Sequence, residues 1–103
     1  LPVAVATDCN PGSCYCESMP FVFGLSVMQM GLTVEEALTA ATLNAAYAIA
    51  LAGRVGSLEP GKQADFLLLD GETPAAIAYH AGGPVVDEVY KLGERVATRG
   101  ACC

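Results

Sequence analysis

The sequence predicts an α/β fold in which a strand and two helices come first and short strands follow. The first observation is Val3–Ala6, a continuous apolar run of the kind that forms strands buried on both faces of a parallel sheet. The second is a stretch after Thr33 in which apolar residues recur at helical spacing. The third is a change beyond Gly53 to short apolar runs separated by proline and glycine turns. We therefore predict two parts, residues 1–54 and residues 55–103.

A loop and a helix are predicted after the first strand. The loop is the stretch Cys9–Cys16. Ser18 can cap a helix because its hydroxyl accepts an amide hydrogen bond from the first turn, and Pro20 has the backbone φ of that turn. We expect this helix to span Pro20–Met30 and to end at Gly31. It is apolar on nearly every side, as in helices that are buried in a larger protein.

The clearest local signal is a capping box at Thr33–Glu36, where the two side chains each accept a hydrogen bond from the other residue's backbone amide. We expect one continuous helix from there to Ala52, with Gly53 as its left-handed stop. Its apolar positions at helical spacing are Leu38, Ala41, Ala45, Ala48, Ile49 and Ala52.

The second part opens with a type II turn at Glu59–Lys62, because Pro60 and Gly61 occupy its two central positions. The elements expected after it are a strand at Ala64–Leu69, a short helix at Pro74–Tyr79 that Thr73 caps and Gly82–Pro84 ends, and a hairpin of Val85–Lys91 and Arg95–Ala97 around Leu92–Glu94.

Composition excludes two classes of partner. The net charge of -6 and the pI near 4.4 argue against nucleic acid and against an anionic membrane surface, since both are bound through Lys and Arg. The longest apolar stretch, Pro20–Leu32, is too short to cross a bilayer. Because 53% of the residues are hydrophobic and only 16% are charged, we expect further chain or a partner to cover part of the surface. The start at Leu1, directly before a strand-like run, leads us to interpret the sequence as a C-terminal fragment.

The five cysteines are Cys9, Cys14, Cys16, Cys102 and Cys103. Their odd number and close spacing do not match a secreted disulfide framework, so we expect reduced thiols in a cytoplasmic protein. The first three, spaced C-x4-C-x-C, match no common zinc-site spacing and lack a fourth ligand, and ordinary small thiols are the preferred interpretation.

Asp8 is the candidate catalytic residue. The end of a parallel strand lies at the mouth of a barrel or open sheet, where a carboxylate can bind a metal and accept a proton from water. The alternative is that Asp8 only stabilises a turn. Nearby, Asn10, Gly12 and Ser13 offer an amide, a closely approachable backbone and a hydroxyl to a ligand, or else form an Asx turn. His80 is interpreted as structural or surface-exposed.

Two motifs carry a family resemblance. "ATD", ending at Asp8, and "GSLEPGKQADFLLLD", Gly56–Asp70, together resemble the C-terminal part of the amidohydrolase superfamily. The resemblance implies a metal-dependent hydrolase with a TIM-like barrel and a small composite β-sandwich. Residues 1–54 then correspond to the last barrel strand, its active-site loop and two helices, and residues 55–103 to the C-terminal portion of the sandwich.

Three further stretches, "ATDCNPGS", "EEALTAATLNAAYAI" and "TPAAIAYHAG", resemble the imidazolonepropionase family within that superfamily, over a range from Val3 to Val96. This resemblance implies hydrolysis of 4-imidazolone-5-propanoate to N-formimino-L-glutamate, a step of histidine degradation. The alternatives are another amidohydrolase, such as a deaminase or cyclic amidase, and a non-catalytic fragment or interaction module.

The same resemblance implies roles for single residues. Asp8 is both the catalytic carboxylate and a ligand of one divalent metal, zinc or iron. Asn10 and Gly12 hold the propionate or formiminoglutamate part of the ligand, and Ser13 holds the ring-bearing substrate. The remaining metal ligands are histidines outside this chain, so we expect the chain alone to be inactive. The expected partners are a small-molecule substrate, the rest of the enzyme chain and a second copy in a homodimer.

Overall fold

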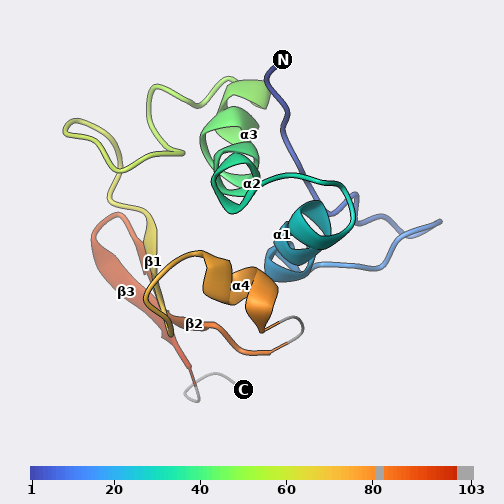
Figure 1. Cartoon of the computed structure of the whole chain (residues 1–103). Helices are drawn as coiled ribbons and strands as arrows, with labels where there is room; N and C mark the ends of the chain where they lie inside the picture. Colours follow the sequence, from blue (N-terminus) through green and yellow to red (C-terminus); the bar gives the residue numbers. More distant parts are fainter. Residues whose placement is uncertain (81–82, 100–103) are drawn as a thin grey trace.

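The computed structural model of the chain describes residues 1–80 and 83–99. Its elements are α1 (Met19–Met28), α2 (Val34–Ala41), α3 (Leu43–Ala48), β1 (Phe66–Leu69), α4 (Ala75–Tyr79), β2 (Val86–Lys91) and β3 (Glu94–Thr98). Figure 1 shows α1, α2 and α3 on one side and the three strands on the other, with α4 beside α1. This combination of helices and a sheet agrees with the predicted α/β class. Within the described residues, no helix has the length and apolar character needed to cross a membrane.

The buried core lies where α1, α2 and α4 meet. Phe23, Ala37 and Ala78, one from each helix, are 3%, 0% and 9% exposed. Gly24 faces Ala78, and the small size of both residues lets α1 and α4 approach closely. The partly buried residues that pack against this core are Val27, Leu32, Val34 and Ile77. The core therefore joins a helix of the second predicted part to helices of the first.

The first helix begins at Met19, one residue before the expected start at Pro20, and ends earlier than expected. The Ser18 hydroxyl accepts a hydrogen bond from the Phe21 amide at 3.3 Å, which confirms Ser18 as the cap. α1 ends at Met28, two residues before the expected end, and Gln29 is its C-terminal cap, with a φ of -119° and a ψ of -30°. Gly31 follows with a φ of 76°, in the left-handed region that the expected stop requires.

The expected continuous helix to Ala52 is wrong, because the chain breaks into α2 and α3 at Thr42. The capping box itself is confirmed: Thr33 and Glu36 exchange side-chain-to-backbone hydrogen bonds of 2.9 and 3.1 Å. At Thr42 the backbone takes φ -119° and ψ -85°, outside the helical region. The Thr42 hydroxyl donates to the Leu38 carbonyl at 2.7 Å, and such bonds from threonine to the preceding turn bend helices.

The expected strand at Val3–Ala6 is not formed in this chain, since the structure assigns no strand there. A strand needs a neighbouring strand to complete its hydrogen bonds, and none of the three strands in residues 1–80 and 83–99 lies beside this run. The run instead bonds to the helices: the Val5 amide donates to the Ala40 carbonyl at 3.1 Å. We call residues 1–6 the N-terminal segment.

The second part of the chain follows its predicted order. The type II turn at Glu59–Lys62 is confirmed, because the Lys62 amide donates to the Glu59 carbonyl at 3.1 Å and Gly61 has a φ of 91°. β1 begins at Phe66 rather than at Ala64. α4 forms within the expected range, and the Thr73 hydroxyl accepts from the Ala75 amide at 3.2 Å. The expected break at Gly82–Pro84 lies partly outside the described residues, because Gly82 is not among them.

The three strands form an antiparallel sheet in the order β1-β2-β3. The hairpin between β2 and β3 is confirmed, with a shorter loop than expected. Leu92 and Gly93 both have positive φ angles, 53° and 80°, which is the signature of a two-residue type I′ turn, and Glu94 pairs with Lys91. The twist of such a turn matches that of the strands, so Glu94 joins β3 instead of the loop.

Candidate functional site

The candidate site lies in the loop between the N-terminal segment and α1, which we call the site loop (residues 7–16). Figure 1 shows it extending away from the helices. The loop is closed by a backbone hydrogen bond of 2.7 Å from the Asn10 amide to the Cys14 carbonyl, and these two residues form an isolated antiparallel bridge. The structure therefore brings Asp8, Asn10, Gly12 and Ser13 into one turn.

The Asn10 side chain organises this turn. Its Oδ1 accepts hydrogen bonds from the amides of Gly12 and Ser13, both at 2.8 Å, and from the Ser13 hydroxyl at 3.3 Å. Its Nδ2 donates to the Asp8 carbonyl at 2.7 Å. This is the Asx-turn arrangement that the sequence left open as an alternative. Most of the hydrogen-bonding capacity of Asn10 is used inside the loop, and one Nδ2 hydrogen remains for a ligand.

Asp8 combines a fixed backbone with a free carboxylate. Its φ of 55° lies in the left-handed region, which Asp tolerates better than most residues. The Asn10 bond holds its carbonyl. Its side chain is exposed, and in the part of the chain that the structure describes no hydrogen bond or ion pair engages the carboxylate. The carboxylate is thus available to a ligand, whereas its peptide unit is held in place.

Thr7, just before Asp8, is held from two sides. The Cys14 thiol donates to the Thr7 carbonyl at 3.2 Å, and the Thr7 hydroxyl accepts from the Cys9 amide at 3.2 Å. Cys9, Cys14 and Cys16 are free thiols, and Cys102 and Cys103 lie outside the described residues. Thr7 was not among the site residues predicted from the sequence. Its position directly before Asp8 is the signal that could have indicated its role.

A metal site would need more ligands than this chain supplies. No group of three or more His, Cys, Asp and Glu residues able to hold a metal occurs among the residues that the structure describes. Asp8 fits the part of one oxygen ligand, because its carboxylate is exposed and unengaged. His80 is exposed and packs edge-on against the Tyr79 ring, with centroids 4.8 Å apart.

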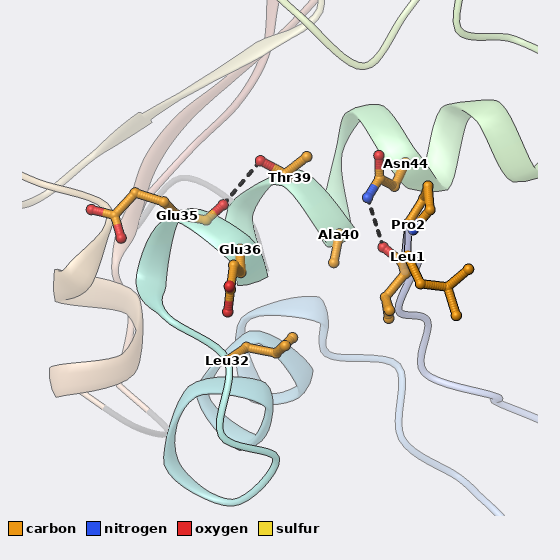
Figure 2. Close-up of a pocket in the computed structure, with 9 residues that line it drawn as sticks. Leu1, Pro2, Leu32, Glu35, Glu36, Thr39, Ala40 and Asn44 are labelled. Atoms are coloured by element: carbon orange, nitrogen blue, oxygen red, sulfur yellow. Dashed lines mark hydrogen bonds between the residues drawn. The ribbon is translucent and has the colours of Figure 1, made fainter.

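The N-terminal groove is a cavity of about 370 Å³ between the N-terminal segment and α2 (Figure 2). Glu35 and Glu36 line it on the helix side and Asn44 at its end. No residue of the site loop lines it. The side chain of Asn44 donates to the Val3 carbonyl at 2.9 Å. The sequence analysis did not predict this contact, and the signal that could have indicated it is a single asparagine in an alanine-rich helix.

Comparison with known proteins identifies the family. The sequence profile of the amidohydrolase family matches residues 1–96. The chain belongs to the amidohydrolase family. Amidohydrolases are generally metal-dependent hydrolases. The family resemblance that the motifs at Asp8 and Gly56–Asp70 carry is therefore confirmed.

Individual amidohydrolases match over most of this chain. It is 71% identical over 91 residues to a protein named imidazolonepropionase from Syntrophobacter fumaroxidans, a match that covers 88% of this chain and 22% of the relative. A second protein of that name, from Desulfotalea psychrophila, is 66% identical over 96 residues, or 93% of this chain and 23% of the relative. The crystal structure of an amidohydrolase from Thermotoga maritima matches with a TM-score of 0.63 and 33% identity, over 79% of this chain and 20% of that one. The chain thus spans about a fifth of the length of these amidohydrolases.

Proposed function

We propose that this chain is part of a metal-dependent hydrolase that opens the ring of 4-imidazolone-5-propanoate and forms N-formimino-L-glutamate in histidine degradation. The observation that carries the proposal is the 71% identity over 91 residues to a protein named imidazolonepropionase. In this proposal residues 1–54 contribute the last strand, loop and helices of a TIM-like barrel, and Val3–Ala6 forms that strand beside strands that lie outside this chain. Residues 55–103 contribute a portion of a β-sandwich, to which the antiparallel sheet β1-β2-β3 belongs.

The exposed apolar side chains support the proposal that the rest of the enzyme chain packs against this part. Soluble proteins rarely leave large contiguous apolar surface open to water, and this chain exposes apolar residues on the N-terminal segment, α1, α3 and the sheet. Those on and after α1 are Phe21, Leu25, Met28 and Met30, and others are Leu1, Val3, Tyr47, Ile49, Leu67, Leu68 and Val96.

We propose the cytoplasm as the location, which the free thiols of Cys9, Cys14 and Cys16 support. A homodimer stays a prediction.

Asp8 is the proposed catalytic carboxylate. A divalent metal, zinc or iron, would lower the pKa of a water bound to it, and Asp8 would be one of its ligands together with histidines outside this chain. Asp8 accepts the proton of the attacking water as the oxygen adds to the ring carbonyl. It then delivers that proton to the ring nitrogen as the C–N bond breaks. The free carboxylate on a held peptide unit supports this role, because proton transfer needs a fixed and unoccupied acceptor.

The turn residues are the proposed substrate contacts. Asn10 has an Nδ2 hydrogen and Ser13 a hydroxyl that can turn toward the substrate's propionate and ring. Gly12 lacks a side chain, and a Cβ there would meet Asn10 Oδ1 at 3.4 Å. Because the turn is already closed by its own hydrogen bonds, these groups need little reorganisation when substrate binds.

The test compares Asp8→Asn with unchanged protein in the full-length enzyme that contains this chain. Metal content is measured first, and turnover of imidazolone propionate is then followed at equal metal loading. We expect Asp8→Asn to lose about 10²-fold or more in kcat, because an amide cannot accept the proton. Glu17→Gln is the matched control, since Glu17 is an exposed carboxylate just beyond the same loop, and it should retain full turnover.

Two results would count against the proposal. Full turnover by Asp8→Asn would remove Asp8 from the mechanism. A metal-loaded unchanged enzyme that leaves imidazolone propionate intact, yet deaminates or hydrolyses another cyclic substrate, would assign the chain to a different amidohydrolase activity.

A further inference from the structure

Tyr15 carries the large apolar side chain of the site loop. The other residues from 7 to 16 have short side chains, of the types Thr, Asp, Cys, Asn, Pro, Gly and Ser. Ligand pockets are lined mostly by apolar and aromatic surface, with a few polar groups that fix the orientation of the ligand. Asp8, Asn10 and Ser13 are such polar groups, and Tyr15, which is 77% exposed, is the residue of this loop that can supply an apolar wall.

The ring of Tyr15 is held against the turn. Its hydroxyl donates to the Pro11 carbonyl at 3.3 Å, so the side chain reaches back along the loop by four residues. Gly12 and Ser13 lie between the two residues that this bond joins, and the loop-closing backbone bond holds the same stretch. An aromatic side chain that is already oriented loses little conformational entropy when it contacts a ligand.

The position of the loop in the proposed enzyme favours a ligand as the contact of this ring. In the proposed barrel the site loop follows the last strand, and the loops at that end of barrel strands build the active site. Phe21, Leu25 and Met28 instead repeat at helical spacing on α1, as in a helix face that packs against other elements. Tyr15 belongs to no such face, because it lies outside the helices and strands.

The substrate of the proposed reaction has a surface that matches this ring. 4-Imidazolone-5-propanoate contains a planar conjugated ring, and planar rings stack on aromatic side chains. The product, N-formimino-L-glutamate, is acyclic because the reaction opens that ring. A stacked aromatic side chain therefore binds the substrate in preference to the product.

We propose that Tyr15 is a specificity-determining residue whose ring stacks on the planar ring of the substrate. Asn10 and Ser13 contact polar groups of the ligand, while Tyr15 covers one face of the ring and excludes water from it. This role rests on the proposed function, because it takes the imidazolone ring as the ligand. It adds to that function a preference for the closed ring over the opened product.

The experiment compares Tyr15→Leu and Tyr15→Phe with the unchanged full-length enzyme. Tyr15→Leu removes the aromatic ring and keeps apolar bulk, whereas Tyr15→Phe keeps the ring and loses the bond to Pro11. Tyr47→Leu is the matched control, since Tyr47 is 69% exposed and lies on α3. Calorimetry measures the Kd of N-formimino-L-glutamate and of imidazole propionate, an analogue that keeps a planar ring but has no ring carbonyl to hydrolyse. Thermal denaturation and metal content show whether each variant is folded and loaded.

We expect Tyr15→Leu to raise the Kd of imidazole propionate about 3- to 10-fold, the range that the loss of one stacked aromatic pair produces. The value of kcat/KM for imidazolone propionate should fall by the same factor. Tyr15→Phe should change the Kd by less than about threefold, because it keeps the ring. The Kd of N-formimino-L-glutamate should stay within about twofold in each variant, since the product has no ring to stack. Tyr47→Leu should match the unchanged enzyme.

An unchanged Kd of imidazole propionate in Tyr15→Leu would overturn the proposal. Equal weakening of the analogue and the product would also overturn it, because Tyr15 would then only shape the turn. If Tyr15→Leu does not fold, nitration of Tyr15 in the unchanged enzyme decides. Imidazole propionate should protect the ring from nitration, and a ring that resists nitration without ligand, or reacts equally with it, contradicts stacking on a ligand.

Failure of the proposed function gives a different result. An enzyme that binds imidazole propionate but leaves imidazolone propionate intact contradicts the proposed reaction alone, and the Tyr15 comparison still decides whether the ring stacks. An enzyme that binds neither ring compound overturns both proposals.

Discussion

The Asp65 carboxylate accepts a hydrogen bond from the Leu92 amide at 2.8 Å, which ties the residue before β1 to the tip of the β2-β3 hairpin. The neighbouring Gly93 amide donates to the Ala64 carbonyl at 2.9 Å. Leu92 and Gly93 both have left-handed backbone angles, so the turn exposes amides that no strand partner satisfies. Asp65 provides one of the missing acceptors.

Replacing Asp65 by Ala should therefore destabilise the fold. We expect the free energy of unfolding to fall by about 1–3 kcal/mol, because the Leu92 amide loses its acceptor. Asp65→Asn, which keeps the Oδ1 acceptor, should lose less. Asp70→Ala is the control: its ion pair with Arg99 is exposed, and its removal should cost below about 1 kcal/mol. Urea denaturation measures all three, and equal losses for Asp65→Ala and Asp70→Ala would contradict the assignment.

Gly56 should not tolerate a side chain. A Cβ at this position would lie 2.7 Å from Ala46 Cβ, and its φ of 98° is strained for any other residue. We expect Gly56→Ala to lower the free energy of unfolding by at least about 2 kcal/mol. Gly53→Ala is the matched control, since a Cβ there meets no atom within 4 Å. Thermal or urea denaturation compares the two, and similar stability of both variants would show that Ala46 can move aside.

The carboxyl of Glu59 should titrate below its ordinary range. Its pKa is lowered from 4.5 by the hydrogen bond from the Ser57 hydroxyl first, and then by the hydrogen bond and charge of Lys62, whose Nζ lies 3.0 Å from Glu59 Oε2. A lowered folded pKa means that ionised Glu59 stabilises the fold above pH 4.5. This contribution is lost as the pH falls through the lower folded value.

Carboxyl NMR titration tests this assignment. Both Ser57→Ala and Lys62→Met should raise the pKa of Glu59 toward 4.5, the serine variant more strongly. An unshifted titration in both variants would show that neither partner engages Glu59 in solution.

Much of the local structure could be predicted because its causes are local. The Ser18 cap, the Thr33–Glu36 capping box and the Glu59–Lys62 turn each depend on residues within four positions of one another. The groups that form these bonds come together whenever the backbone adopts the local helical or turn conformation. The chemistry-bearing turn at Asn10 was predictable for the same reason, although its internal Asx geometry was only one of two open interpretations.

The failures occurred where one signal fitted two outcomes. The apolar periodicity after Thr33 is satisfied by one helix or by two, and the non-helical backbone at Thr42 makes it two. An apolar run such as Val3–Ala6 forms a strand only beside another strand, and in this structure helices lie beside it instead.

By itself, the sequence determined the α/β class, the caps and turns, the family and the residue types gathered after Ala6, since consecutive residues encode all of these. Only the tertiary structure decided that Asn44 meets Val3, that Ala40 accepts from Val5 and that, within the described residues, no hydrogen bond or ion pair engages the Asp8 carboxylate. The physical reason is that contacts across some forty residues depend on how whole elements pack, because many partners of equal chemistry compete for the same donor and acceptor.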